Sequence, residues 1–295
     1  MEGGHRWRRL GQRPRAVLLP GRQRLLGRPR AEPIASGGDW RSLGDFDQVA
    51  GGGQRWPGLA KPPYDRGMRF ARDSFIVGVP EHQLATFDAA WQWLSEPSGA
   101  WTADEKLAMV DVARNASPRL LHDRRPATID HLSSEVEIGR KLSPLVVDTV
   151  ERVAVEAGAI CREWASAVID VLGDTAYAEL VAVIATVTPI DRACELLGRP
   201  VEPLPDPLAG LPTGERADPT VDIGAYVPAA QGFAGPNVAK SLSVAPTANL
   251  VRLGVVRALY SGTRFGELRW DDGALNRPQV ELVAARTSAL NECFY

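Results

Sequence analysis

Cysteine, histidine and long apolar runs are all scarce in this sequence, and each scarcity excludes a class of protein. The three cysteines, Cys161, Cys194 and Cys293, are few, scattered and odd in number, which excludes a disulfide framework. The four histidines form no metal-ligand cluster (His5, His82, His122 and His131). We therefore expect neither a metal nor a cofactor.

Excess charge of one sign is lacking as well. The formal net charge is −2, which argues against a nucleic-acid partner for the whole chain. Charged residues interrupt every apolar stretch before it reaches the roughly 18 residues of a transmembrane helix, and no apolar segment of signal-peptide length follows the basic N-terminus. We expect a cytoplasmic protein without membrane contact. Its 295 residues, 44% of them hydrophobic, suffice for one large domain or two smaller ones.

Residues 1–67 differ in composition from the rest of the chain. Arginine recurs there among Gly and Pro, and apolar residues occur only in short groups without helical or strand periodicity. Such a segment buries too little surface to offset its ordering entropy, so we expect a disordered tail. A basic arm or a transit-like peptide is the functional alternative, and Met68 is an alternative start of the protein.

Beyond this tail the apolar pattern is helical. Leu84, Phe87, Trp91 and Leu94 recur at intervals of three and four residues, which predicts an amphipathic helix. A second predicted helix opens at Thr102 with the sequence of a capping box, in which two acidic residues occupy the first turn. No strand-like alternation extends beyond a few residues anywhere in the chain. The sequence therefore predicts an all-α fold.

Capping and helix-breaking residues mark the next helices. Ser143 precedes a helix that has proline in its first turn. Asp174 is the expected cap of a longer helix over residues 176–197. We expect Pro189 to kink or interrupt this helix and Gly198 to end it.

A proline-rich stretch, residues 199–228, divides the helical part of the chain in two. Its prolines forbid a regular helix and favour an extended, polyproline-like connector. We therefore expect a first helical lobe over residues 68–198 and the start of a second lobe over residues 229–295. The second lobe contains a predicted helix around residues 248–259 and a last one with Asn276 as its N-cap.

A weak internal repeat relates the two predicted lobes. Laying Glu105 over Glu281 aligns three identical residues downstream of each glutamate and places Cys293 on Ser117. The overlay indicates either a duplicated helical unit whose first copy has lost its cysteine, or a coincidence between two alanine-rich helices.

The C-terminal sequence carries the most specific motif. Glu281 lies on a predicted helix that leads into Leu290-Asn291-Glu292-Cys293-Phe294-Tyr295. This pattern resembles the AhpD-like and carboxymuconolactone-decarboxylase-like families, whose core motif is a helical glutamate, a Leu-Asn-x turn, Cys-x-x-Cys and a histidine four residues further on. The last three residues match the first three of Cys-x-x-Cys. The resemblance covers roughly residues 68–295 and implies an AhpD-like helical bundle, a two-lobed degenerate repeat with an incomplete second lobe.

The resemblance also implies a chemistry. In these families the second cysteine of the motif attacks a hydroperoxide and becomes a sulfenic acid, and the first cysteine resolves it to a disulfide. A glutamate and a histidine move the protons. By position, Cys293 is the resolving cysteine and Glu281 the proton-relay carboxylate, while the attacking cysteine and the histidine have no counterpart. The implied function is a fragment of a thiol-dependent hydroperoxide reductase, inactive by itself, with a small-molecule hydroperoxide and a thiol reductant as partners.

Geometry limits how Glu281 and Cys293 can meet. Twelve residues of straight helix separate them by about 18 Å, at a rise of about 1.5 Å per residue. They can approach each other only if the chain turns near Asn291, and asparagine tolerates turn conformations.

Plainer explanations compete for the same residues. Cys161 and Cys194 are expected to be small core hydrophobes, and a glutamate in a first helical turn is favoured by the helix dipole alone. Two other functions stay open, namely a non-enzymatic helical interaction module or pseudoenzyme, and a cofactor-free decarboxylase. We also expect the apolar residues of the last helix to be exposed, which would favour aggregation or a homo-oligomer (Val280, Leu282, Val283 and Leu290).

Overall fold

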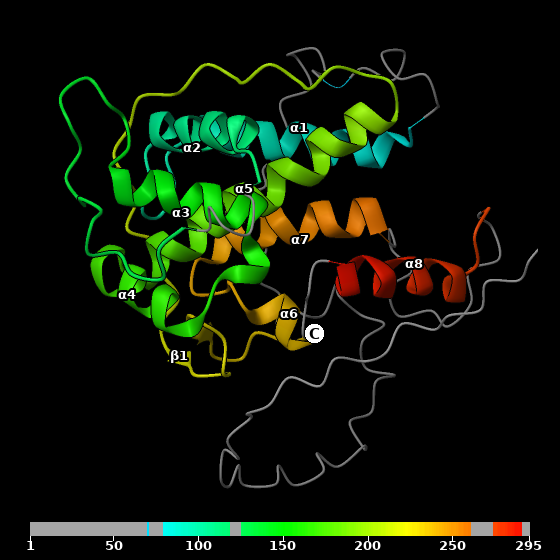
Figure 1. Ribbon diagram of the computed structural model, residues 1–295. Helices are drawn as coiled ribbons and strands as arrows, with labels where there is room; N and C mark the ends of the chain where they lie inside the picture. Colours follow the sequence, from blue (N-terminus) through cyan, green and yellow to red (C-terminus); the bar gives the residue numbers. More distant parts are fainter. Residues whose placement is uncertain (1–69, 71–78, 119–124, 261–273, 291–295) are drawn as a thin grey trace, which may run out of the picture. The chain divides into compact units, whose positions relative to one another are not determined.

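The computed structural model describes residues 70, 79–118, 125–260 and 274–290 (Figure 1). The described residues are mainly helical, which confirms the all-α prediction; β1 (Thr220–Val221) and β2 (Ala229–Ala230) add one short antiparallel pair. The predicted tail over residues 1–67 lies outside the described residues. The helices, in chain order, are α1 (Glu81–Ser95), α2 (Ala103–Asn115), α3 (Pro144–Val155), α4 (Arg162–Leu172), α5 (Asp174–Leu196), α6 (Asn237–Lys240), α7 (Pro246–Tyr260) and α8 (Arg277–Leu290).

The first two helices follow their sequence signals. The predicted apolar face of α1 is buried, with Leu84, Phe87, Trp91 and Leu94 each no more than 1% exposed. At the start of α2 the capping box is reciprocal, because the Thr102 side chain accepts from the backbone N–H of the third helical residue while that residue's carboxylate accepts from the Thr102 N–H. Both predictions are confirmed.

The start of α5 corrects one prediction. Gly173, not Asp174, holds the N-cap position, and its φ of 88° is in the region that favours glycine. Asp174 is the first helical residue, and its carboxylate pairs with Arg216 Nη2 at 2.7 Å. The sequence signal failed here because an acidic residue suits the first helical turn as well as the cap.

The interior of α5 shows that Pro189 does not interrupt the helix, and the end of α5 confirms the predicted glycine stop. The helix runs uninterrupted through Pro189, although proline removes one backbone donor. Its neighbours Val187 and Ile190 are buried, and this packing favours the helix over a break. At the C-terminus, Gly198 has a φ of 74°, and Arg199 N donates to Cys194 O at 2.8 Å, which is the Schellman arrangement expected of a glycine stop.

α5 is the central helix of the core. It contacts α1, α2, α3, α4 and α7 (Figure 1). This position explains why apolar residues surround much of its circumference, since a helix contacted from several sides buries more than one face. Its buried apolar side chains include Tyr177, Leu180, Val183, Ile184, Val187 and Ile190.

The segment 199–228 is extended, as predicted, but it is bound closely to the helices. Leu208 N donates to Ser95 O at 2.7 Å, and Thr213 N donates to Ser98 O at 2.8 Å, so the segment follows the end of α1 and the loop after it. Beyond it, α7 packs against α1 and α5, and its Ala248 and Val255 belong to the same hydrophobic core. The apolar face of α7 is therefore buried among helices that precede the connector.

The described part of α8 begins as predicted. Gln279 N donates to Asn276 Oδ1 at 3.1 Å, and Asn276 N donates to Gln279 Oε1 at 2.9 Å, so Asn276 is the N-cap. Gln279 is therefore the third residue of α8, as Glu105 is the third residue of α2. The repeat overlay aligns Glu105 with Glu281, two positions later, so it does not align the starts of the two helices.

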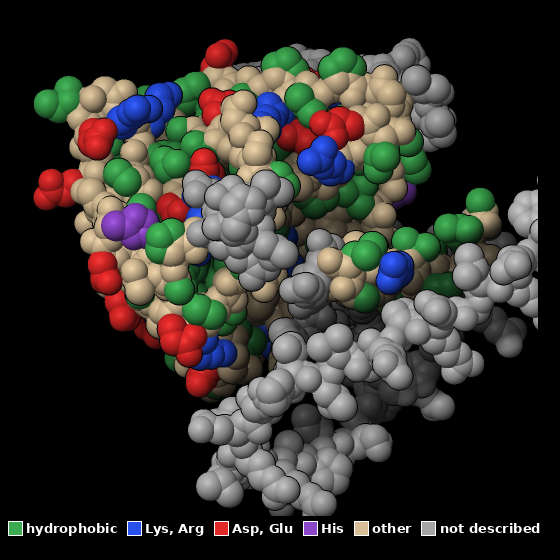
Figure 2. Space-filling model, viewed as in Figure 1, with side chains coloured by type: hydrophobic (Ala, Val, Ile, Leu, Met, Phe, Trp, Pro, Cys, Tyr) green, Lys and Arg blue, Asp and Glu red, His purple; other side chains and the backbone are tan. Residues whose placement is uncertain are grey.

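Three of the four apolar side chains of α8 that the sequence predicts to be exposed are exposed, whereas Val280 is partly buried. Leu282 is 71% exposed, Val283 60% and Leu290 66%. Figure 2 shows hydrophobic side chains along α8, and on the visible face of the remaining described surface acidic and basic side chains are interspersed. Among the described helices, none is at once long and apolar enough to cross a bilayer.

Candidate functional site

Glu281, the carboxylate that the sequence singles out, lies on α8 in contact with two polar partners. The Tyr260 hydroxyl, at the end of α7, donates to Glu281 Oε2 at 2.8 Å. Arg277, one helical turn before Glu281, places its Nε 3.3 Å from Oε1. The Glu281 side chain is 46% exposed, so a reacting group can approach it from solvent.

The Tyr260 hydroxyl keeps its proton at neutral pH. Burial, followed by the hydrogen bond to Glu281, raises the pKa of Tyr260 to about 12. The phenol is therefore a hydrogen-bond donor to the carboxylate, and Arg277 adds a positive charge beside it. Such a carboxylate can accept a proton from a substrate while its neighbours hold it in place.

The helix dipole does not account for Glu281. It is the fifth residue of α8, and the first turn of this helix contains no acidic residue. The expectation that Glu281 lies in the first turn is therefore wrong. The spacing of four residues between Arg277 and Glu281 could have been recognised in the sequence as a helical ion pair. Tyr260, 21 residues earlier, could not.

The predicted redox partner of Glu281 is Cys293, which lies outside the described residues. Its pairing with Glu281 therefore stays a prediction. The structure brings Glu281 together with Tyr260 and Arg277, which the sequence analysis did not assign to the site.

The two described cysteines differ from each other. Cys161 is exposed and holds the N-cap position of α4, which corrects the expectation that it is a core residue. Cys194 is fully buried on α5, as expected. Its Sγ lies 3.8 Å from Arg199 Nη1, and burial raises the pKa of the thiol, which favours the protonated form at neutral pH.

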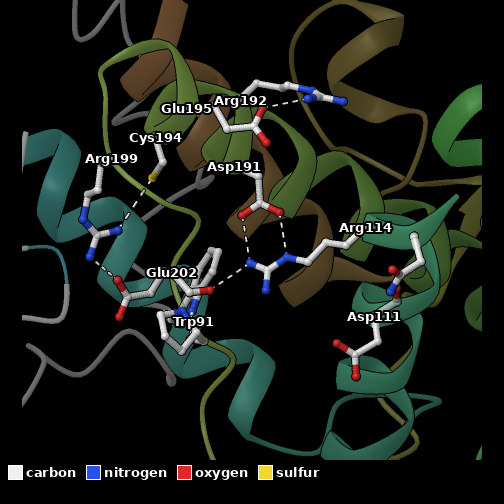
Figure 3. Close-up of polar contacts among 11 residues, drawn as sticks. Trp91, Asp111, Arg114, Asp191, Arg192, Cys194, Glu195, Arg199 and Glu202 are labelled. Carbon is white, nitrogen blue, oxygen red and sulfur yellow. Dashed lines mark hydrogen bonds and ion pairs between the residues drawn. The ribbon is translucent and has the colours of Figure 1, made fainter. Parts of the chain in front are cut away.

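Cys194 borders a network of ion pairs (Figure 3). Arg114 on α2 contacts Asp191 on α5 through two parallel bonds, Nε to Oδ2 at 2.8 Å and Nη2 to Oδ1 at 2.9 Å. Arg114 Nη2 also donates to the backbone oxygen of Glu202 at 2.9 Å, and the Glu202 carboxylate pairs with Arg199. The network joins α2, α5 and the extended segment. Its opposite charges are paired with one another, so we interpret it as a stabilising network and not as a binding site.

A second polar cluster is buried beside the loop between α1 and α2. Glu179 of α5 is 1% exposed and accepts from Gly99 N at 2.8 Å and Ala100 N at 2.7 Å. Lys106 of α2 is also fully buried, and its Nζ donates to Trp93 O at 2.5 Å. Burial raises the pKa of Glu179 and lowers that of Lys106 to about 8. The Glu179 carboxylate binds backbone donors of the loop, so the cluster fixes the loop in place.

Residues that could bind a metal are not grouped in the part of the chain that the structure describes. No set of three His, Cys, Asp or Glu side chains is arranged there to hold an ion. Compared with protein-family models, with curated proteins and with solved structures, the chain matches none of them.

Proposed function

We propose that this chain, built on an AhpD-like helical bundle, carries the resolving cysteine and the proton-relay carboxylate of a thiol-dependent hydroperoxide reductase. One observation carries the proposal. Glu281 on α8 is half exposed and is held between Tyr260 and Arg277, and the same chain segment continues to Cys293. The resemblance of this segment to the Leu-Asn-x-Cys motif supports the assignment of Cys293.

The overall reaction balances with two thiols. An attacking thiolate, supplied by a second cysteine, takes the terminal oxygen of the hydroperoxide, so the O–O bond breaks and a sulfenic acid and an alkoxide form. A proton converts the alkoxide to an alcohol. The Cys293 thiolate then attacks the sulfenic sulfur, which forms a disulfide and expels hydroxide, and a proton converts the hydroxide to water. Two molecules of a thiol reductant return this disulfide to two thiols and become a disulfide themselves, so the hydroperoxide has been reduced by two electrons.

Glu281 serves the proton transfers of this sequence. Its carboxylate accepts the proton of a thiol, and the protonated acid then donates to the leaving oxygen. Tyr260 keeps its own proton and orients Oε2 through the bond of 2.8 Å. Tyr260 is in this account a positioning residue.

Loss of free thiols on addition of a hydroperoxide tests the proposal. The chain ending at Tyr295 is compared with one extended beyond it by the residues that complete Cys-x-x-Cys and its histidine. The extended chain should lose two thiols per peroxide, and Cys293→Ser should leave the sulfenic acid unresolved. Cys161→Ser, at the exposed cysteine of α4, is the matched control and should behave like the parent. Equal thiol loss in the shorter and extended chains would refute the proposal.

A non-enzymatic interaction module is the second candidate. The observation in its favour is the exposure of Leu282, Val283 and Leu290 on α8, at 71%, 60% and 66%. In this case α8 binds a second copy of the chain through these side chains. Sedimentation velocity should then show a concentration-dependent dimer that is lost in Leu282→Gln and kept in Leu196→Gln, a substitution of an exposed leucine at the end of α5. A monomer at all concentrations contradicts this candidate.

A further inference from the structure

The arginines that are largely buried in the described residues are paired with carboxylates, except at one position. Arg114 contacts Asp191, Arg199 contacts Glu202, and Arg125 and Arg152 share Asp148. Arg252 of α7 is 8% exposed, and within the described residues no carboxylate contacts it. A buried guanidinium without an opposite charge is costly, so its retention calls for a partner.

Neutral groups hold the Arg252 guanidinium in a fixed orientation. Nε and Nη2 donate to Asn249 Oδ1 at 3.2 and 2.8 Å, and Nη2 also donates to Val238 O at 3.0 Å. Asn249 is itself fully buried and fixed, because its Nδ2 donates to Ala239 O at 2.9 Å. These bonds use the Nε hydrogen and both hydrogens of Nη2.

The other two donors of the guanidinium are on Nη1, and no acceptor in the described part of the chain binds them. Nη1 is not among the polar atoms that are sealed from solvent without a partner. Since Nη1 has no acceptor among the described residues, it must belong to the 8% of Arg252 that remains exposed to solvent. The result is a rigid, positively charged donor at the surface between α6 and α7, and no carboxylate in the described part of the chain compensates its charge.

We propose that Arg252 binds an oxyanion of a small-molecule ligand, a carboxylate or a phosphate, through Nη1. Charged hydrogen bonds from arginine are the usual means of holding such groups. Preorganisation by Asn249 and Val238 lowers the entropic cost of binding. No carboxylate of the described residues contacts Arg252, which favours an external anion over an internal one. The partners of Arg252 differ from those of Glu281, and this inference does not depend on the proposed redox function.

Anion-dependent thermal stability of the full chain tests this inference. Sodium acetate and sodium phosphate are titrated separately at constant ionic strength, with sodium chloride as the reference salt. At least one oxyanion should raise the unfolding midpoint saturably, and the anion that does so identifies the source as carboxylate or phosphate. Arg252→Gln should weaken the apparent affinity about tenfold or more, which is the effect of one charged hydrogen bond.

Arg192→Gln is the matched control, because Arg192 is an exposed arginine that pairs with Glu195, three residues further along the same helix. It should respond to the anions like the parent. If chloride acts as strongly as acetate and phosphate, or if Arg252→Gln responds like the parent, the proposal is wrong. If Arg252→Gln does not fold, backbone amide hydrogen exchange of the parent, measured with and without the oxyanion, tests the site instead. A saturating oxyanion must slow exchange around Val238 and Asn249, and unchanged exchange there refutes the site.

Discussion

Arg114 and Asp191 form a two-point ion pair between α2 and α5, with Nε to Oδ2 at 2.8 Å and Nη2 to Oδ1 at 2.9 Å. The two residues are 77 positions apart in the sequence, and their side chains are 20% and 11% exposed. Geometry of this kind adds direction as well as attraction, because both planar groups must face each other. The pair therefore fixes how α2 lies against the central helix.

Removing one member of this pair should destabilise the fold. We expect Asp191→Ala to lower the free energy of unfolding by about 2 kcal/mol, since a charged hydrogen-bond partner is lost and a largely buried guanidinium is left behind. Urea denaturation measures the effect. Glu195→Ala removes an exposed partner of Arg192 on the same helix and should cost about 0.5 kcal/mol or less. Equal losses in both variants would show that the interhelical pair has no special role.

Lys106 predicts a dependence of stability on alkaline pH. Its pKa is lowered by burial to about 8 from 10.5, so between these values the folded state binds fewer protons than the unfolded state. A group with a depressed folded pKa contributes stability that grows as pH rises through this window. The free energy of unfolding of the parent, relative to that of Lys106→Met, should rise by roughly 3 kcal/mol between about pH 8 and 10.5. A constant difference across the window would contradict the burial of a charged lysine.

Thiol reactivity should separate the two described cysteines. Cys161 is exposed, whereas Cys194 is fully buried with a raised thiol pKa. Under native conditions we expect iodoacetamide to modify Cys161 at least roughly 100-fold faster than Cys194, because a buried thiol reacts only when the structure opens. Peptide mass spectrometry follows each site. In denaturant the two rates should converge, and rapid labelling of Cys194 in the folded protein would contradict its place in the core.

Two glycine substitutions should act in opposite directions. Gly173→Ala should destabilise by about 1 kcal/mol, because the backbone has a φ of 88° there, although an added Cβ meets no neighbour. Gly254→Ala lies inside α7, where the new Cβ makes only an ordinary contact of 3.7 Å with Thr86, and should stabilise by about 0.5–1 kcal/mol. Thermal melts of both variants test the assignment, and destabilisation by Gly254→Ala would contradict the packing of α7 against α1.

The local structure was largely predictable from the sequence, and the reason is visible at Thr102 and Gly198. Their signals depend on neighbouring residues alone, and both act as predicted. Pro189 does not interrupt α5, because the packing of this helix outweighs the local preference of proline for a helix break. The association of α7 with α1 depends on contacts between segments far apart in the chain, which no spacing rule encodes.

In the candidate site, too, local contacts are predictable from the sequence and contacts between distant segments are not. Arg277 and Glu281 are four residues apart on one helix, so their contact follows from helical geometry. Tyr260 reaches Glu281 from another helix, and Arg252 is fixed by Asn249 together with a backbone oxygen of α6. Both features depend on tertiary structure. The sequence could indicate Glu281 as a candidate functional carboxylate, but it could not indicate Tyr260, which contacts Glu281 from another helix.

The central claim is that the Glu281 carboxylate takes part in peroxide reduction. Its most direct test is the rate at which a hydroperoxide oxidises the thiols of the extended chain, measured for the parent, Glu281→Gln and Glu135→Gln. Glu135 is an exposed glutamate in the loop before α3 and serves as the control. We predict that Glu281→Gln slows thiol oxidation by about 100-fold or more, the usual contribution of a general acid–base group, while Glu135→Gln reacts like the parent. Equal rates in all three proteins would contradict a role for the Glu281 carboxylate in peroxide reduction.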